Sequence, residues 1–416
     1  MSASQLDYRV SSLHPRLSDW RDAGLQEIQT FPHILPFGPG EHDLSANRVT
    51  LSSGQVIRGA GEGITTFLLP SLYSRYGKSD KASSGNPYGY SWKYGWFECV
   101  PGAVDIGIED CTIKFLSTVA APHHAEKGYN AVFFKKARNA SVRRVTMLNC
   151  DNGVLLEGCT NSLVEDVKVA HPDRTPNNEG QYGHYGVQCR LDTTRCLTKA
   201  VIDTVTHHDL SVERSSYNVF EDCSGRNLCL DHHRDNPHHN LWTDINVGLG
   251  TRVWKSGGNV LKGQHNGVGE VFWNLRKGDG TPITTLPPFG LTYWNRRLAI
   301  VGHTQNRLNA DLSKEWVEGL TTVEPPNVYR AQRGEVVLPP PPPSTQFLVG
   351  RQVTATAQLN IRSEPRLAST KLGTQPTGAH GVVVESEVHD VVSGFWYVKV
   401  DFMSGVDGYC GTDRLS

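Results

Sequence analysis

A 22-residue repeat constrains the fold of this chain more than any other feature of its sequence. Residues 139–147 and residues 161–169 carry apolar side chains at equivalent positions, 22 residues apart. The same spacing relates further segments: residues 131–134 with 153–156, and residues 218–223 with 240–245. Short β-branched segments broken by Gly, Asn and Asp at a fixed period are typical of a β-solenoid, in which each coil buries its apolar face against the next. Helical leucine-rich repeats share this period, but the chain lacks their leucine-rich consensus.

Two steps between equivalent strands are longer than the repeat. One leads from Ile108 to its equivalent, Val142, and the other from Val154 to Val187. Each step is one coil plus an insertion, and we expect the insertions to form projecting loops. They are centred on residues 117–128 and 171–184. Loops on a rigid scaffold commonly carry binding residues.

The composition agrees with a turn-rich β protein. The 416 residues include 41 Gly and 23 Pro but only three Met. A formal net charge of -1 gives no general attraction to nucleic acid. The absence of a stretch of about 20 apolar residues predicts no membrane span. The nine Cys include no CxxC pair, and we expect most of them to be small buried side chains, with disulfides as the alternative.

The predicted domain organisation follows from where the repeat ends. We expect a solenoid domain over residues 1–337, a proline-rich linker over residues 338–345 and a small domain over residues 346–416. The sequence begins without a charged and then apolar leader, which predicts either a cytosolic protein or a secreted one whose signal is absent from this sequence. The glycosylation sequon at residues 139–141 favours an extracellular protein.

Two parts of the chain resemble known families. Residues 50–69 resemble the opening turn of pectate-lyase-like β-helices, and residues 128–273 resemble a family related to pectate, alginate and chondroitin lyases. Residues 353–365, with residues 396–400, resemble a bacterial-type SH3 domain. The resemblance implies an all-β fold, a right-handed parallel β-helix followed by a small SH3-like β-barrel. Domains of the second type often bind cell walls or peptides, and a spacer role is the alternative.

Polar side chains that a solenoid does not need for packing are concentrated between residues 184 and 273. His184, His208 and His232 follow one another at intervals of 24 residues, close to one coil, so we expect a column of imidazoles on one face. Asp231 and Arg234 would lie beside it and supply proton acceptors, donors and a cation. In the alternative interpretation, the column is a hydrogen-bonded ladder with a structural role.

The resemblance to alginate and chondroitin lyases also implies a location for the site. Residues 210–218 resemble the segment that carries the catalytic lysine of those enzymes, which places Arg214 at the position of the base. His207 and Asp209 fall where calcium ligands would lie, and Asp231 or His232 falls at the position of an arginine. Because the residue types differ at each position, the resemblance implies where the chemistry occurs and not which residues perform it.

The leading hypothesis is a polysaccharide lyase that cleaves a uronate-containing glycan by β-elimination. This reaction needs a base, a cation beside the carboxylate and an acid for the leaving oxygen. We expect His208 or His232 as the base, Arg234 or Arg214 as the carboxylate clamp and His233 as the acid. The predicted catalytic set is His208, His232, His233, Arg234, Asp231 and Arg214. The predicted substrate-binding set is His184, Tyr185, Arg190, Arg252 and Trp254.

Two other functions remain open at this point. A glycoside hydrolase would use a carboxylate pair drawn from Asp209, Asp231 and Asp244. A non-catalytic glycan-binding protein would use aromatic side chains, which could equally lie in the core. The aromatic candidates are Tyr182, Tyr185, Trp92 and Trp96.

Metal binding is open as well. Calcium is one candidate cofactor, because it prefers carboxylate oxygens. Its candidate ligands are Asp209, Glu213, Asp222 and Asp231. Three histidines on one face could instead hold a transition metal.

Overall fold

The computed structural model describes residues 20–25, 33–44, 48–70, 94–123, 125–203, 205–334, 352–355, 358–365, 369–390, 395–411 and 415. The chain divides into two compact units, Met1–Val337 and Leu338–Ser416. The predicted linker at residues 338–345 and the candidate Trp92 lie outside the described residues.

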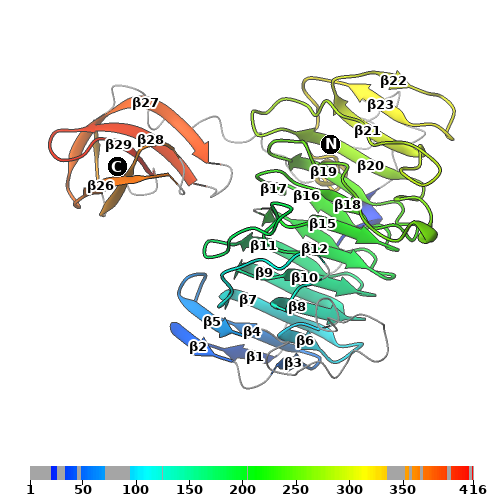
Figure 1. Ribbon diagram of the computed structural model, residues 1–416, viewed down its shortest axis with the longest axis horizontal. Helices are drawn as coiled ribbons and strands as arrows, with labels where there is room; N and C mark the ends of the chain where they lie inside the picture. The colour runs from blue at the N-terminus through cyan, green and yellow to red at the C-terminus, as the bar shows by residue number, and fades with distance from the viewer. Residues whose placement is uncertain are drawn as a thin grey trace. The chain divides into compact units, whose positions relative to one another are not determined.

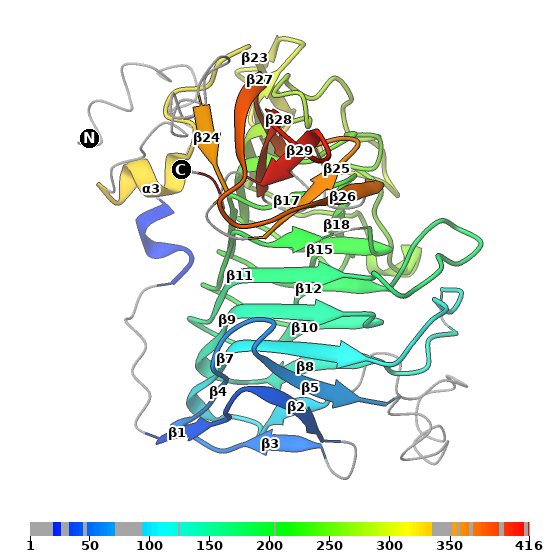
Figure 2. The same cartoon turned by 90° about the vertical axis from the view of Figure 1, so that its left-hand side faces the viewer.

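The first unit is a parallel β-helix built from two stacks of strands (Figures 1 and 2). The larger sheet has 16 strands, and its main path is, in order, β1 (His33–Pro36), β4 (Gln55–Arg58), β7 (Val104–Phe115), β9 (Arg138–Leu148), β11 (Leu163–Ala170), β13 (Leu197–Lys199), β16 (Val219–Glu221), β19 (Leu241–Asn246), β20 (Glu270–Arg276), β21 (Leu298–His303), β23 (Trp316–Gly319) and β22 (Arg307–Leu308). Four short strands lie beside this path: β2 (Gly40–Asp43), β5 (Thr65–Leu69), β14 (Ile202–Asp203) and β17 (Ser224–Gly225).

The smaller sheet of the β-helix has seven strands and carries the polar cluster described below. Its strands are, in order, β18 (Leu230–His232), β15 (His208–Glu213), β12 (Tyr185–Arg190), β10 (Asn152–Glu157), β8 (Asn130–Lys135), β6 (Phe97–Cys99) and β3 (Val49–Leu51). Neighbouring strands are parallel and pair in register, so side chains at equivalent positions of successive coils lie above one another.

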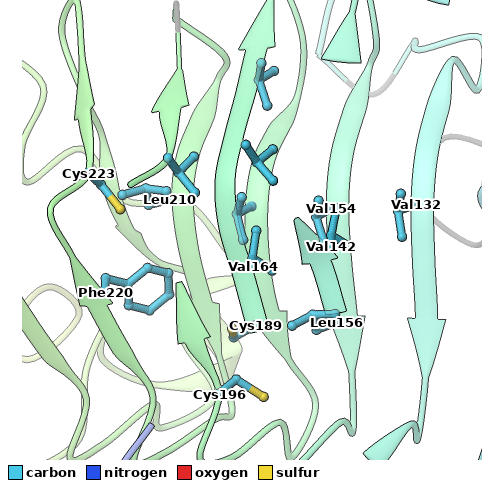
Figure 3. Packing of buried hydrophobic residues seen from close by; sticks show 14 of the residues in the cluster. Val132, Val142, Val154, Leu156, Val164, Cys189, Cys196, Leu210, Phe220 and Cys223 are labelled. Atoms are coloured by element: carbon cyan, nitrogen blue, oxygen red, sulfur yellow. The ribbon is translucent and has the colours of Figure 1, made fainter. Parts of the chain in front are cut away.

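Residues that the repeat makes equivalent lie opposite each other in paired strands. Val142 pairs with Val164 across β9 and β11, and Val132 pairs with Val154 across β8 and β10. The longer steps are also paired as predicted, since Ile108 lies opposite Val142. These side chains point into a continuous apolar core between the two sheets, part of which is drawn in Figure 3. The predicted all-β class with a parallel β-helix is therefore confirmed.

The outer face of the larger sheet is covered by two short helical segments. These are η2 (Trp20–Asp22) and α3 (Val328–Gln332). Trp20 and Tyr329 are buried against an apolar column that includes Val219, Leu241 and Trp273. The sequence pattern fades after Trp273, but the pairing of strands continues. Trp273 of β20 lies opposite Val301 of β21.

The second unit is a small β domain with one antiparallel sheet. Its strands are, in order, β24 (Gln352–Thr354), β27 (His380–Asp390), β28 (Phe395–Phe402), β29 (Gly408–Gly411), β25 (Leu359–Arg362) and β26 (Lys371–Gln375). Val353, Ile361 and Val398 contribute to its core. The SH3-like type of this domain stays a prediction.

The cysteines behave as small buried side chains. All nine are buried with free thiols, and Cys189, Cys196 and Cys223 point into the core of the β-helix (Figure 3). Within the described part of the chain, no helix is both long enough and apolar enough to cross a membrane.

Candidate active site

The two predicted insertions form loops that lie side by side. They lie at the side of the seven-stranded sheet where its strands begin. Val119 of the first forms an isolated parallel bridge with Thr175 of the second, and the amide of Thr175 donates to the carbonyl of Thr118 at 2.9 Å. The first loop brings His123 and Glu126 to the start of strands β12 and β15, where a group of further imidazoles lies.

Four histidines from three segments of the chain make contact where β12 and β15 begin. The Nε2 atoms of His123 and His184 are 3.1 Å apart, and Nδ1 of His184 lies 2.8 Å from Oε1 of Glu126. The ring of His123 stacks on that of His207, with 4.1 Å between centroids. The ring of His208 lies edge-on to that of His207 at 4.4 Å. We call these four residues, together with His233, the imidazole cluster.

His233 is held by a buried aspartate on the outer face of the same sheet. Strand register places Gln188, Ser211 and Asp231 in one column. Ser211 Oγ donates to Asp231 Oδ2 at 2.6 Å, and His233 Nδ1 lies 2.9 Å from the same oxygen. The Gly257 amide donates to Asp231 Oδ1 at 2.8 Å. Asp231 is fully buried, whereas 18% of the His233 side chain is exposed, so the pair presents only its imidazole to solvent.

The charges of this pair follow from their proximity. Burial by itself would raise the pKa of the Asp231 carboxyl, but the neighbouring imidazoles and the hydrogen bonds from His233 and Ser211 hold that pKa below its ordinary value. Burial by itself would lower the pKa of His233. The charge of Asp231 and its hydrogen bond to the ring outweigh burial, so the pKa is raised above 6.5. By contrast, burial holds the pKa of His208 well below 6.5 and lowers that of His207 to about 3. The cluster therefore contains one imidazole that is readily protonated, His233, and two that stay neutral, His207 and His208.

Tyr185 links the two parts of the cluster. Its ring stacks on His184 at 4.2 Å and on His208 at 5.1 Å between centroids. Its hydroxyl oxygen lies 3.4 Å from Nε2 of His233, the ring nitrogen that Asp231 does not contact. Burial raises the pKa of Tyr185 well above 10, so its hydroxyl keeps its proton. The site thus pairs a proton acceptor, His233 Nε2, with a proton donor.

Gly257 closes one side of the cluster. A Cβ atom at this position would lie 2.7 Å from Cε1 of His208 and 2.8 Å from Cε1 of His233, closer than such contacts allow. The two imidazoles can therefore approach the segment that follows Trp254 only because residue 257 has no side chain.

Gly257→Ala should lower the free energy of unfolding by about 1–3 kcal/mol, because two tightly packed rings must shift to admit a methyl group. Chemical denaturation measures the change. The matched control is Gly278→Ala, where the nearest atom would be 3.7 Å from the new Cβ and stability should change little. Equal stability of the two variants would contradict the described packing.

His232 does not belong to the cluster. Leu210 pairs with Leu230 across β15 and β18, so this coil is shorter than the spacing from His208 to His232. His232 consequently lies opposite Val212 and points into the core. It is fully buried against Trp242, and its Nε2 lies 2.9 Å from Oε2 of Glu270. The predicted column of three histidines is therefore corrected: His184 and His208 are neighbours, and His232 is a core residue that cannot act as a base.

Two of the predicted arginines bind backbone carbonyls. Arg234 donates through NH1 to the Thr292 carbonyl at 2.8 Å and has further carbonyl partners. Arg252 donates through NH2 to the carbonyls of Thr206 and His207, each at 2.8 Å. Arg234 thus does not serve as the predicted carboxylate clamp, and Arg252 positions the segment that carries the cluster.

The other two arginines form ion pairs near the C-terminal ends of β12 and β15. Arg214 lies within 3.3 Å of Asp192 and follows the end of β15, six residues after His208, which corresponds to about 20 Å along a strand. Arg190 lies within 3.5 Å of Glu213 on the next coil. Arg214 is not brought to the imidazole cluster, so its predicted role as base or clamp is not consistent with its position. Arg190 lies in the same column as Glu213, and its charge acts on His233 of the cluster, so its role in binding stays a prediction.

The predicted aromatic residues are mostly in the core. Trp254 packs against Phe272 and Trp294, and its Nε1 donates to the Thr285 carbonyl at 2.7 Å. Trp96 is fully buried. The assignment of Trp254 to substrate binding therefore does not fit the structure.

The carboxylates proposed for calcium or for hydrolysis are not gathered in one place. Asp209 is fully buried, accepts from the amide of Cys229 at 2.7 Å and has its pKa raised by burial. Asp222 and Asp244 follow or lie on strands of the larger sheet, whereas Asp231 belongs to the smaller one. In the part of the chain that the structure describes, the groupings able to hold a metal ion are rich in histidine.

Sequence reasoning missed His123 and Glu126. Both lie in the first insertion, more than two coils before His184 in the chain, so no coil-to-coil spacing relates them to the other histidines. The available signal was the insertion itself, which predicted a loop with a binding role but not which of its side chains face the site.

Comparisons with known proteins give similarities at the level of structure. No protein-family model matches the sequence, and no curated protein is significantly similar to it in sequence. One similar structure is a DFA-IIIase from Arthrobacter chlorophenolicus A6 without its lid, at 13% identity, covering 70% of this chain and 89% of that one, with a TM-score of 0.42. Another is the A-module of a mannuronan C-5 epimerase from Azotobacter vinelandii, at 11% identity. The similarity covers 69% of this chain and 87% of that one, with a TM-score of 0.33. A third is an exopolygalacturonase from Thermotoga maritima, at 9% identity. The similarity covers 65% of this chain and 74% of that one, with a TM-score of 0.35.

Proposed function

We propose that this protein is an extracellular carbohydrate-active enzyme that cleaves a uronate-containing polysaccharide by β-elimination. The observation that carries the proposal is the Asp231–His233 pair, in which Nε2 of the partly exposed His233 lies 3.4 Å from the Tyr185 hydroxyl. A base held by a buried carboxylate, with a proton donor beside it, supplies two of the three groups that an elimination requires. The resemblance of the sequence to polysaccharide lyases supports the same class of reaction.

In the proposed reaction, His233 Nε2 removes the proton from the carbon beside the uronate carboxylate. The electron pair of that C–H bond forms a carbon–carbon double bond, and the bond to the glycosidic oxygen breaks. Tyr185, of whose surface 3% is exposed, donates its proton to that oxygen through the hydroxyl beside the partly exposed His233, and His233 returns a proton to Tyr185 after the product leaves. Asp231 keeps the imidazole oriented and stabilises its protonated form. His233 therefore takes the role of base that the sequence suggested for His208 or His232.

Hydrolysis is less well supported by the arrangement of the carboxylates. An enzyme of that kind needs an acid and a second carboxylate facing the sugar. Asp209 and Asp231 are fully buried, and Asp244 lies on the other sheet and contacts Arg276. The carboxylate nearest to the cluster that is well exposed is Glu179, which lies 3.1 Å from His207 Nδ1 and has no carboxylate partner among the described contacts.

A single assay tests the proposal against both alternatives. The full-length protein is incubated with polygalacturonate, alginate, chondroitin and other uronate polymers, and ultraviolet absorbance and reducing ends are followed together. Elimination raises both signals, because its product is unsaturated. Reducing ends without absorbance would indicate a hydrolase, and saturable binding without either signal would indicate a glycan-binding protein. Either result would overturn the proposal.

The pH dependence of the reaction should report the state of His233. As a base this residue must be neutral, and its pKa is raised above 6.5 by Asp231. We therefore expect kcat/KM to rise with pH through an inflection above 6.5 and then to level off. Asp231→Asn removes the charge that raises the pKa of His233, so the inflection should move to lower pH. A value of kcat/KM that falls with rising pH would show that His233 acts as the acid.

A further inference from the structure

We propose that His123, His184 and His208 form a binding site for a divalent transition-metal ion. One ring nitrogen from each of the three lies within 4.8 Å of the other two. In a tetrahedral zinc site with bonds of about 2.0–2.1 Å, neighbouring nitrogens are about 3.3 Å apart. The Nε2 atoms of His123 and His184 are already 3.1 Å apart, so a small movement of His208 or of the loop that carries His123 completes the geometry.

A carboxylate oxygen lies close to Nδ1 of two of the three imidazoles. Oε1 of Glu126 lies 2.8 Å from Nδ1 of His184, and Oδ2 of Asp231 lies 3.3 Å from Nδ1 of His208. A carboxylate at Nδ1 favours the proton on that nitrogen and leaves the lone pair of Nε2 for a metal. This is the usual outer-sphere arrangement of metal-binding histidines.

His208 supplies an independent indication of a ligand. Only 2% of its surface is exposed, and neither of its ring nitrogens makes a hydrogen bond of good geometry. Leaving a buried polar atom without a partner costs free energy, about 1–3 kcal/mol for each atom. A bound metal ion would give one of these nitrogens a partner and remove part of that cost.

The donor set indicates the kind of metal. Three neutral imidazoles suit zinc and other first-row transition metals, whereas calcium prefers oxygen ligands. A second group, His208, Asp231 and His233, also lies within bonding range of an ion. We favour the first group, because Oδ2 of Asp231 already accepts from Ser211 and Oδ1 accepts from the Gly257 amide.

A metal in this position would supply the cation that the elimination requires. The arginines predicted for that purpose are bound to carbonyls or lie at the other end of the strands, as described above. An ion with three protein ligands keeps a position open for a carboxylate oxygen. This role in the reaction rests on the proposed function, whereas the binding of the metal does not.

The test measures metal binding directly. Full-length protein is dialysed against a chelator and titrated with Zn²⁺ by calorimetry, and with Co²⁺ by visible spectroscopy. We expect roughly one ion per chain and the ligand-field bands of a tetrahedral Co²⁺ site. His123→Ala and His208→Ala should each weaken binding by at least the tenfold or so seen on loss of an outer-sphere partner. His123 is a partly exposed loop residue, so this variant should fold even if His208→Ala does not, which circular dichroism can verify.

His303→Ala is the matched control, because His303 is a buried histidine on β21, in the other sheet. It should bind Zn²⁺ as the wild type does. Absence of binding by the wild type, or equal affinity of His123→Ala and the wild type, would overturn the site. Elimination at an undiminished rate in chelator-treated protein would overturn its role in the reaction and leave the proposed function intact. Metal binding with no unsaturated product from any polymer would leave the site intact and overturn the proposed function.

Discussion

Replacing His233 by alanine is expected to lower kcat/KM for the elimination by about 100- to 10,000-fold, the usual contribution of a general base. Its two neighbours His207 and His208 are poor substitutes for it. His208 is almost completely buried behind Gly257, and burial keeps the pKa of His207 at about 3, which makes it a weak base. The rate of formation of the unsaturated product measures the effect.

Two further variants show whether the loss comes from chemistry or from misfolding. Tyr185→Phe keeps the rings stacked on His184 and His208 but removes the hydroxyl, so it should also reduce kcat strongly while the protein stays folded. His42→Ala is the control. His42 lies on β2, several coils away from the cluster, so its replacement should leave kcat/KM unchanged. Wild-type kcat/KM in His233→Ala would refute the assigned base.

Replacing Glu270 by alanine is expected to lower the free energy of unfolding of the β-helix by about 3–5 kcal/mol, as on breaking a buried ion pair. The Glu270 carboxylate is fully buried, and it faces three donors from other coils. His232 Nε2 lies 2.9 Å from Oε2, Asn240 Nδ2 donates to Oε1 at 2.8 Å, and Trp242 Nε1 donates to Oε2 at 3.2 Å. Without the carboxylate, these donors stay buried and lack a partner.

Denaturant unfolding followed by tryptophan fluorescence measures this loss, because the Trp242 indole itself contacts Glu270. Glu270→Gln should be less destabilising, since the amide oxygen can still accept. The control is Glu41→Ala on β2, where the side chain is exposed and stability should change by less than about 0.5 kcal/mol. Similar unfolding curves for Glu270→Ala and Glu41→Ala would show that His232 and its neighbours do not depend on the carboxylate.

The fold of the first unit could be predicted because its register repeats locally. A coil that buries valine against valine must place equivalent residues opposite each other, so counting residues identified the pairs β7–β9, β9–β11, β8–β10, β10–β12 and β16–β19. The two insertions were visible for the same reason, as departures from the period.

The candidate site could be predicted only in part. Its location on the coils around β12, β15 and β18 followed from the concentration of His, Asp and Arg in the sequence, and Asp231 and His233 do lie together. The arginines could not be assigned in this way, because their long side chains reach carbonyls and carboxylates that belong to distant segments.

The sequence by itself determined the repeat, the all-β class and the region in which polar side chains gather, since each depends on residues a fixed distance apart. Only the tertiary structure decided which histidines meet. The coil between β15 and β18 is four residues shorter than the spacing from His208 to His232, so His232 lies opposite the core residue Val212 and not beside His208, while Asp231 faces outward beside His233. His123 arrives from a loop whose path no spacing in the chain specifies, because an insertion is placed by the surface it packs against.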